Sequence, residues 1–436
     1  MNKSLYLIVC CCTALVCVFS SSCHSPKKQL TDSSIIDRKI YKDQLEGFWL
    51  AQCIANWTGL ITEMDKIGIP SNGKAGGFYT RKNWGKEDHP NLWGSRDLSD
   101  TIDFLLVEKD SIWGADDDTD IEYIYQELLY KSPSLVLTGE QIRDGWMTHI
   151  HKEEENFLWV SNQTAFDLMQ QGIIPPQTSD PELNPHYEMI DAQLTTEIFG
   201  FFAPGHPNIA LEMSHLPIRT TARSHAAEIA EFNVVMYALA AKKTKHKNLK
   251  EKTQWMAQQA RKNMIDDSYP AKMYDFVVKQ YQMGSPWEAA RDSLHEKYQI
   301  RQEDEYHWAT KDESCNGCFA AGINFGASIV SLLYGEGDLK ETIKIGSLAG
   351  WDSDNPTATW GGMLGFMLGK KEVEKIFGKP LSSRFDIHRT RKGFPNDGID
   401  TFENMAQKGI SIVDRVVVER MNGSIDSEKN RWVIPR

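Results

Sequence analysis

The chain has 436 residues, a formal net charge of −12 and eight cysteines. An acidic chain of this kind offers no basic face for nucleic acid, so we expect no nucleic-acid partner. Most of the cysteines lie within the first 23 residues, and the rest of the chain is therefore not a disulfide scaffold.

The first 22 residues have the order of an export signal. Lys3 precedes an apolar run from Leu5 to Phe19, and small residues lead into Cys23. The run is shorter than the roughly 20 residues that span a bilayer. We predict a lipoprotein signal peptide over 1–22, with Cys23 as the lipid attachment residue. Ordinary cleavage without a lipid is the alternative.

Residues 23–37 follow this signal and are predicted to be a flexible tether, because they are polar at first and contain Pro26. The protein is then exported and touches the membrane only through its lipid anchor. No acidic run follows Cys23, which favours the periplasmic side over the cell surface.

Helical patterns dominate residues 38–436, and strand-like alternation is scarce. The first predicted helix covers 41–64, and small residues recur along it every fourth position at Gly47, Ala51, Ala55 and Gly59. Such a stripe lets another backbone approach closely. We predict an all-α fold, a compact multi-helix single domain.

Further helices are predicted in chain order. One begins at the acids Asp116 to Asp118, and others cover 226–241, 319–334 and 339–348. The last begins near Pro356, a residue that suits a first helical turn, and carries glycines at every fourth position.

Two acidic clusters stand at the starts of two of these helices, more than 200 residues apart. The first is Asp116, Asp117 and Asp118, and the second is Asp352 and Asp354. A helix cap explains one aspartate, but not three in a row. If the clusters face one another they repel, and a cation between them would make the fold tolerable. Oxygen ligands predict magnesium, manganese or calcium.

The order of these motifs resembles the ADP-ribosylglycohydrolase family. Asp117-Asp118-Thr119 is similar to the family's DDT motif, and Gly350-x-Asp352-x-Asp354 to its late GxDxD motif. Gly59 and Glu63 match a Gly followed four residues later by a functional Glu. The resemblance covers about residues 40–420. It implies two Mg²⁺ ions, with Mn²⁺ or Ca²⁺ as alternatives, held by Asp116, Asp117, Asp118, Asp352, Asp354 and Asn355.

The sequence also departs from the family pattern. Asp116 stands at a usual Thr or Ser ligand position, Asn355 replaces a Thr, and Asn56 replaces the aspartate of a GDALG-like stretch. The middle of the chain resembles a divergent subgroup common among exported bacterial proteins, in which the family name does not imply the substrate. Trp57, Gln193 and Trp351 are the predicted substrate-binding residues.

The resemblance and the acids together predict a metal-dependent glycosyl hydrolase that cleaves an N- or O-glycosidic bond with water. Asp118, reaching both metals, is the predicted residue for orienting or deprotonating the water, and Glu63 for contacting substrate or the leaving group. The substrate is a small molecule or a glycan. It is either an ADP-ribosylated compound or, for an exported glycoside hydrolase, a glycan or a nucleoside-like glycoside. A non-catalytic, metal-stabilised binding lipoprotein is the third hypothesis, and the oligomeric state stays open.

Overall fold

The computed structural model describes residues 33–68, 77–89, 99–242, 244–246, 248–307 and 316–435. The predicted signal peptide and the lipid attachment residue Cys23 lie outside the described residues. None of the described helices is long and apolar enough to cross a membrane.

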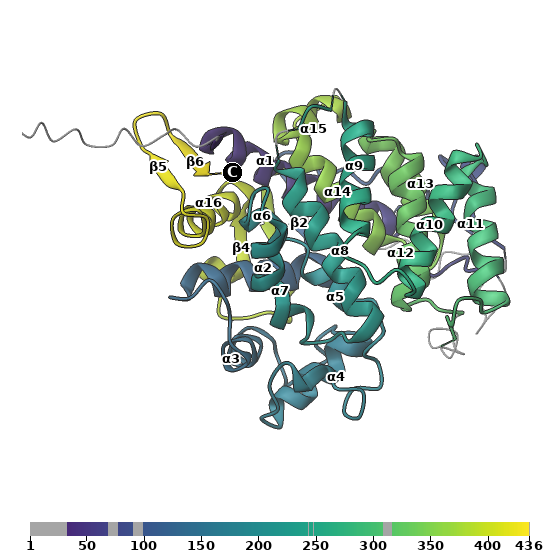
Figure 1. Cartoon of the computed structure of the whole chain (residues 1–436), viewed down its shortest axis with the longest axis horizontal. Helices are drawn as coiled ribbons and strands as arrows, with labels where there is room; N and C mark the ends of the chain where they lie inside the picture. Colours follow the sequence, from purple (N-terminus) through teal and green to yellow (C-terminus); the bar gives the residue numbers. More distant parts are fainter. Residues whose placement is uncertain are drawn as a thin grey trace, which may run out of the picture.

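The described chain is predominantly helical and forms one all-α body with little sheet (Figure 1). Hairpin β5–β6 and helix α16 stand at one end of the long axis, and α10 and α11 stand at the other. The helices are α1 (Arg38–Gly59), α2 (Asp117–Lys131), α3 (Gly139–His149), α4 (Val160–Gln170), α5 (Asp191–Thr195), α6 (Phe199–Phe202), α7 (Pro207–Ile218), α8 (Ser224–Ala240), α9 (Leu249–Arg261), α10 (Tyr269–Gln282), α11 (Trp287–His295), α12 (Ala321–Tyr334), α13 (Leu339–Ala349), α14 (Asp354–Leu368), α15 (Lys370–Phe377) and α16 (Phe402–Glu419).

Two small sheets join segments that are far apart in sequence. Strands β1 (Ser33–Asp37), β6 (Arg431–Pro435) and β5 (Ser424–Asp426) form one antiparallel sheet. Strand β1 overlaps the end of the predicted tether, so the prediction of a flexible segment through residue 37 is wrong for its last five residues. The backbone of these residues pairs with the C-terminal strand, and that partner is not visible in the local sequence.

The second sheet bears on the site. Strand β2 (Trp113–Gly114) pairs in parallel with β3 (Arg384–Asp386), and β3 pairs antiparallel with β4 (Ile399–Thr401). Strand β2 leads into the first acidic cluster. Strand β3 leads into the segment around residue 390, which this pairing brings beside that cluster.

Among the described elements, helices α1 and α14 pack against each other most extensively, and both carry small residues at the contact. A Cβ on Gly47 would lie 2.5 Å from the carbonyl oxygen of Gly365. A Cβ on Gly59 would lie 2.4 Å from the Cα of Asp354. The predicted small-residue stripe therefore does pack against another backbone, and it brings the end of α1 onto the start of α14.

Helix α1 ends at Gly59, five residues before the predicted boundary. The chain turns there, and Met64 adopts a left-handed conformation with φ 55°. The Met64 N–H donates to the carbonyl of Trp351 at 2.7 Å, and the Ser353 hydroxyl donates to the carbonyl of Gly59 at 3.0 Å. These bonds hold the turn that carries Glu63 against the second acidic cluster.

Candidate active site and metal centre

The first acidic cluster is organised by the start of α2. The Asp116 carboxylate accepts the Asp117 N–H at 2.9 Å, and the Thr119 hydroxyl exchanges hydrogen bonds with the Asp116 backbone at 3.1 Å. Asp116 therefore caps the helix, as acids do at a positive helix terminus. The capping leaves Asp117 and Asp118 available for another role.

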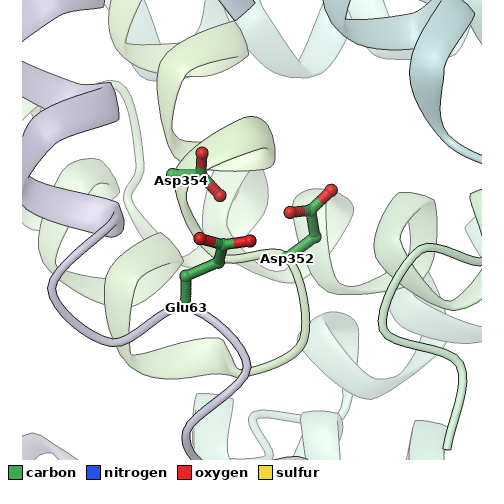
Figure 2. A group of neighbouring side chains, drawn as sticks. All are labelled: Glu63, Asp352 and Asp354. Carbon is green, nitrogen blue, oxygen red and sulfur yellow. The ribbon is translucent and has the colours of Figure 1, made fainter. Parts of the chain in front are cut away.

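Acids from both clusters converge, as the sequence predicts. One group consists of Glu63, Asp352 and Asp354, whose carboxylates turn toward one another (Figure 2). The other consists of Asp116, Asp118 and Asp354. Within each group, one carboxylate oxygen of each residue lies within 4.8 Å of those of the others. Asp354 belongs to both groups, so the two groups adjoin.

Two sequence assignments change with this geometry. Asp118 was the predicted bridging acid, but Asp354 is the residue common to both groups. The physical reason is position: Asp354 is the first residue of α14, where Gly59 lets α1 approach its backbone. Glu63, predicted to contact substrate or the leaving group, stands inside one of the groups. Asp117 lies in neither group but lines the same cavity.

Burial and mutual repulsion disfavour the charged forms of these acids. Burial raises the pKa of Asp118 to about 7, with Asp116 adding to the rise and Asn355 and Asn56 opposing it. Burial also raises the pKa of Asp354 well above its usual range, and Asp352 and Asp118 raise it further. The same two causes act on Glu63, Asp117 and Asp352. Such a cluster at neutral pH needs either protons or bound cations.

The residues present fit divalent ions such as magnesium. Their donor atoms are carboxylate oxygens, which hard cations prefer. The Oδ1 atom of Asp354 is buried and has no hydrogen-bond partner among the described residues. An unsatisfied buried carboxylate oxygen of this kind calls for a ligand.

Two asparagines hold the acids in place. The Asn56 side-chain nitrogen donates to Asp118 at 2.7 Å, to Asp116 at 3.1 Å and to Asp354 at 3.4 Å. Asn56 therefore contacts both clusters. An aspartate at this position would add another negative charge to them. The Asn355 nitrogen donates to Asp118 at 3.1 Å. Asn355 thus fixes an acid through its nitrogen, and its role as a metal ligand stays a prediction.

The acids form one wall of a cavity of about 410 Å³. Trp57 lines the cavity as predicted, and its Nε1 donates to the Gly114 carbonyl at 3.0 Å. Trp351 does not: its ring is fully buried against Phe78, and its Nε1 donates to the Asn316 carbonyl at 3.1 Å. The prediction that Trp351 binds substrate is therefore wrong, because the ring belongs to the core.

Gln193 also fails as a predicted substrate contact. It is buried and does not line the cavity. Asp191 and Leu194, three residues apart on α5, do line it. Residues at this spacing share one helix face, and Gln193 lies off that face.

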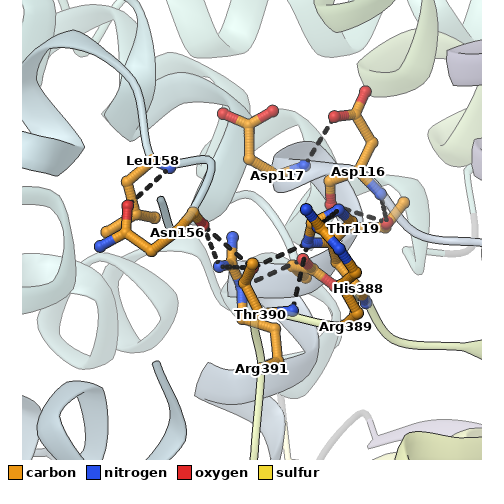
Figure 3. A network of polar contacts seen from close by, with 10 residues as sticks. Asp116, Asp117, Thr119, Asn156, Leu158, His388, Arg389, Thr390 and Arg391 are labelled. Atoms are coloured by element: carbon orange, nitrogen blue, oxygen red, sulfur yellow. Dashed lines mark hydrogen bonds and ion pairs between the residues drawn. The ribbon is translucent and has the colours of Figure 1, made fainter. Parts of the chain in front are cut away.

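Sequence reasoning missed a buried ion pair at the edge of the site. The Arg391 Nε lies 3.1 Å from the Asp120 Oδ2, and both side chains are 1% exposed. Arg391 also donates to the Asn156 carbonyl at 2.6 Å (Figure 3). The sequence signal was weak, because Asp120 stands beside the first cluster but its partner lies 271 positions later, in the segment that sheet β2–β3–β4 positions.

Comparison with known proteins identifies the family of the chain. A family model described as ADP-ribosylglycohydrolase matches residues 37–401. No curated protein matches the chain. A solved structure named "ADP-ribosylglycohydrolase-related protein complex" is 14% identical, with a TM-score of 0.44, over 86% of this chain and 98% of that one. The family model spans both acidic clusters, and the chain accordingly belongs to the ADP-ribosylglycohydrolase family and is a glycosyl hydrolase.

Proposed function

We propose that this hydrolase cleaves a glycosidic bond by a binuclear, magnesium-dependent mechanism. The observation that carries the proposal is the sharing of Asp354 between two groups of three acids. Glu63, Asp352 and Asp354 would hold one ion, and Asp116, Asp118 and Asp354 the other, with manganese or calcium as alternatives. Ions in such a site bind sugar hydroxyls and lower the pKa of water.

The chain's own residues then have distinct tasks. Asp117 lines the cavity but belongs to neither acid group. It is therefore the proposed residue for orienting the attacking water and accepting its proton, in place of Asp118. Asn56 and Asn355 keep the Asp118 carboxylate turned toward the shared site through bonds of 2.7 and 3.1 Å. Trp57 is the proposed contact for the sugar, because its ring lies at the cavity wall.

Two substrate classes remain for the same chemistry. One is ADP-ribose attached to a protein or small molecule, and the other is a glycan or nucleoside-like glycoside. We favour the second, because export would separate the enzyme from cytoplasmic ADP-ribose donors. A binding lipoprotein without catalysis is the third hypothesis, and an assay for turnover distinguishes it from the two enzyme hypotheses.

Activity assays test the proposal directly. The mature protein is incubated with magnesium and a panel of ADP-ribosylated compounds and α- and β-glycosides, with and without a chelator. We expect turnover that the chelator removes and magnesium restores. Turnover that persists in chelator would contradict the metal mechanism. Failure on the whole panel, together with intact magnesium binding, would favour the binding lipoprotein.

Matched variants separate the metal ligands from Asp117. Asp354→Asn and Glu63→Gln should weaken magnesium binding in calorimetry, Asp354→Asn the more because it serves both groups. Asp117→Asn should bind magnesium as the wild type does and lose turnover by about 100-fold. Equal magnesium affinity in wild type and Glu63→Gln would remove Glu63 from the ligand set.

We also propose that the chain is exported and anchored by a lipid on Cys23, facing the periplasm. The support is the order of charge, apolar run and small residues before Cys23. Metabolic labelling with palmitate should mark the wild-type protein and not Cys23→Ser. Labelling of both proteins, or of neither, would count against the anchor.

A further inference from the structure

The cavity has two unlike walls. The acids form one wall. The other, which we call the apolar wall, has mostly apolar side chains from the segment before α4, from the start of α4, from α5 and the residue before it, and from the segment before α12: Phe157, Trp159, Val160, Ile190, Leu194 and Phe319, with Asp191 among them. The volume of about 410 Å³ falls within the range for small-molecule sites. A molecule that reaches the acids therefore also meets the apolar wall.

Two aromatic rings, those of Phe157 and Trp159, lie on this wall. Trp159 is 42% exposed. Its ring stands edge-on to Phe157, with centroids 6.2 Å apart and an interplanar angle of 85°. Exposed aromatic surface beside a polar cavity is typical of a ligand-binding face.

The segment that carries these rings is held firmly to the acid wall. Phe157 and Val160 adopt φ values of 52° and 36°, which are costly for side chains of their size. The Asn156 carbonyl accepts hydrogen bonds from Arg391 at 2.6 Å and from the Thr390 hydroxyl at 3.0 Å (Figure 3). Because Arg391 also pairs with Asp120 on α2, the two walls keep a fixed spacing.

Among the described residues, those that line the cavity offer a phosphate no unpaired lysine or arginine. Their basic side chains are Arg391 and His388. Arg391 is already bound to Asp120 and to the Asn156 carbonyl. Arg389 is exposed and is not one of the lining residues; its guanidinium lies over the Phe157 ring at 4.8 Å. A diphosphate against the apolar wall would therefore lose its water without gaining a counter-ion from the lining, which is costly.

We propose that the substrate is an uncharged glycoside whose leaving group is planar and apolar, seated on Phe157 and Trp159. This inference rests on the proposed function and names its substrate class. In the reaction the bond between C1 and the aglycone oxygen breaks, and a new bond forms between C1 and the oxygen of water. One proton of that water passes to the departing aglycone oxygen. The planar group gains from burial and ring contact.

Binding of matched probes tests the subsite. Phenyl and methyl glycosides of ribofuranose and of galactopyranose are compared with ADP-ribose by calorimetry in saturating magnesium. We expect the phenyl glycoside of at least one sugar to bind about tenfold more tightly than its methyl partner. Trp159→Ala should reduce that ratio to near one and leave methyl glycoside binding unchanged. Tyr130→Ala is the matched control, since Tyr130 is 46% exposed and lies outside the cavity.

Three results would overturn the proposal: equal affinity for phenyl and methyl partners, no binding of any phenyl glycoside, or tighter binding of ADP-ribose than of every phenyl glycoside. Cleavage is then followed with and without chelator. A phenyl preference in binding without magnesium-dependent cleavage would leave the subsite standing and reject the proposed function. Magnesium-dependent cleavage without a phenyl preference would reject the subsite alone.

Discussion

The buried acids of helix α2 have two opposite kinds of surroundings: other acids around Asp118, and an arginine or lysine beside Asp120 and Glu127. Asp118 and its cluster face other acids, and the described chain gives Asp118 and Asp354 no Lys or Arg ion pair. Asp120, two residues later, pairs with Arg391. Glu127, two turns further on, lies 2.8 Å from the Lys408 Nζ.

The pKa of Glu127 follows this division, whereas burial keeps the pKa of Asp120 raised in spite of its cation. Burial raises the pKa of Glu127, but Lys408 and Lys131 outweigh it and hold that pKa below its usual value. Burial raises the pKa of Asp120 to about 6 even though Arg391 opposes the rise. Asp354 has other acids as neighbours, and its pKa rises well above the usual range. Buried acids that pair with a lysine or arginine of the chain stabilise the fold. Buried acids without such a partner indicate a site for a bound cation.

The largest expected effect on stability comes from breaking the buried ion pair between Arg391 and Asp120. Arg391→Met leaves Asp120 buried without its cation, and we expect a loss of about 3–5 kcal/mol in the free energy of unfolding. Chemical unfolding measures it. The double variant Asp120→Asn with Arg391→Met should recover much of the loss. Arg143→Met, at an exposed pair with Asp144, is the control and should cost at most about 1 kcal/mol. Equal losses of unfolding free energy in Arg391→Met and Arg143→Met would show that the buried ion pair stabilises the fold no more than the exposed one.

Bound magnesium should supply the acid groups with positive charge, as Arg391 supplies it to Asp120. Because the ions bind the folded state, magnesium at 100 times its dissociation constant should add about 2.7 kcal/mol of stability. Differential scanning calorimetry in chelator and in magnesium measures the shift in Tm. Asp354→Asn should lose most of this shift. A wild-type melting curve that is the same across millimolar magnesium, manganese and calcium would show that the acid groups hold no such ion.

Neutralising Asp118, which has no Lys or Arg partner, and Asp120, which has one, should change stability in opposite directions. In chelator, Asp118→Asn relieves repulsion and should hold or raise stability, by up to about 1.4 kcal/mol for each pKa unit of relief. Asp120→Asn leaves Arg391 without its carboxylate and should lower stability. Both substitutions are nearly isosteric, so neither opens a cavity. Unfolding midpoints of the two variants in the same buffer make the test. A loss of stability in both would show that Asp118 contributes to the metal-free fold.

A smaller, pH-dependent effect is expected from the buried pair Glu122 and Glu197. Burial raises the pKa of Glu197 to about 8, above its unfolded value. The folded state then holds its proton more tightly, so this stability is present at acidic pH and is lost as pH rises toward 8. Glu197→Gln should reduce the loss of unfolding free energy between about pH 5 and pH 8 by roughly 1 kcal/mol or more. A parallel pH profile in the two proteins would assign the decline to other groups.

The sequence alone determined the all-α class, the helix that carries the small-residue stripe, and the two acidic clusters that converge. Periodicity and the N-terminal ends of helices are local properties, and they place Asp117 at the start of α2 and Asp354 at the start of α14. Only the tertiary structure decided that Asp354, rather than Asp118, is shared, because sharing depends on how closely Gly59 lets α1 approach. It likewise placed Trp351 in the core and Arg391 beside Asp120, since burial and long-range pairing are set by neighbours distant in the chain.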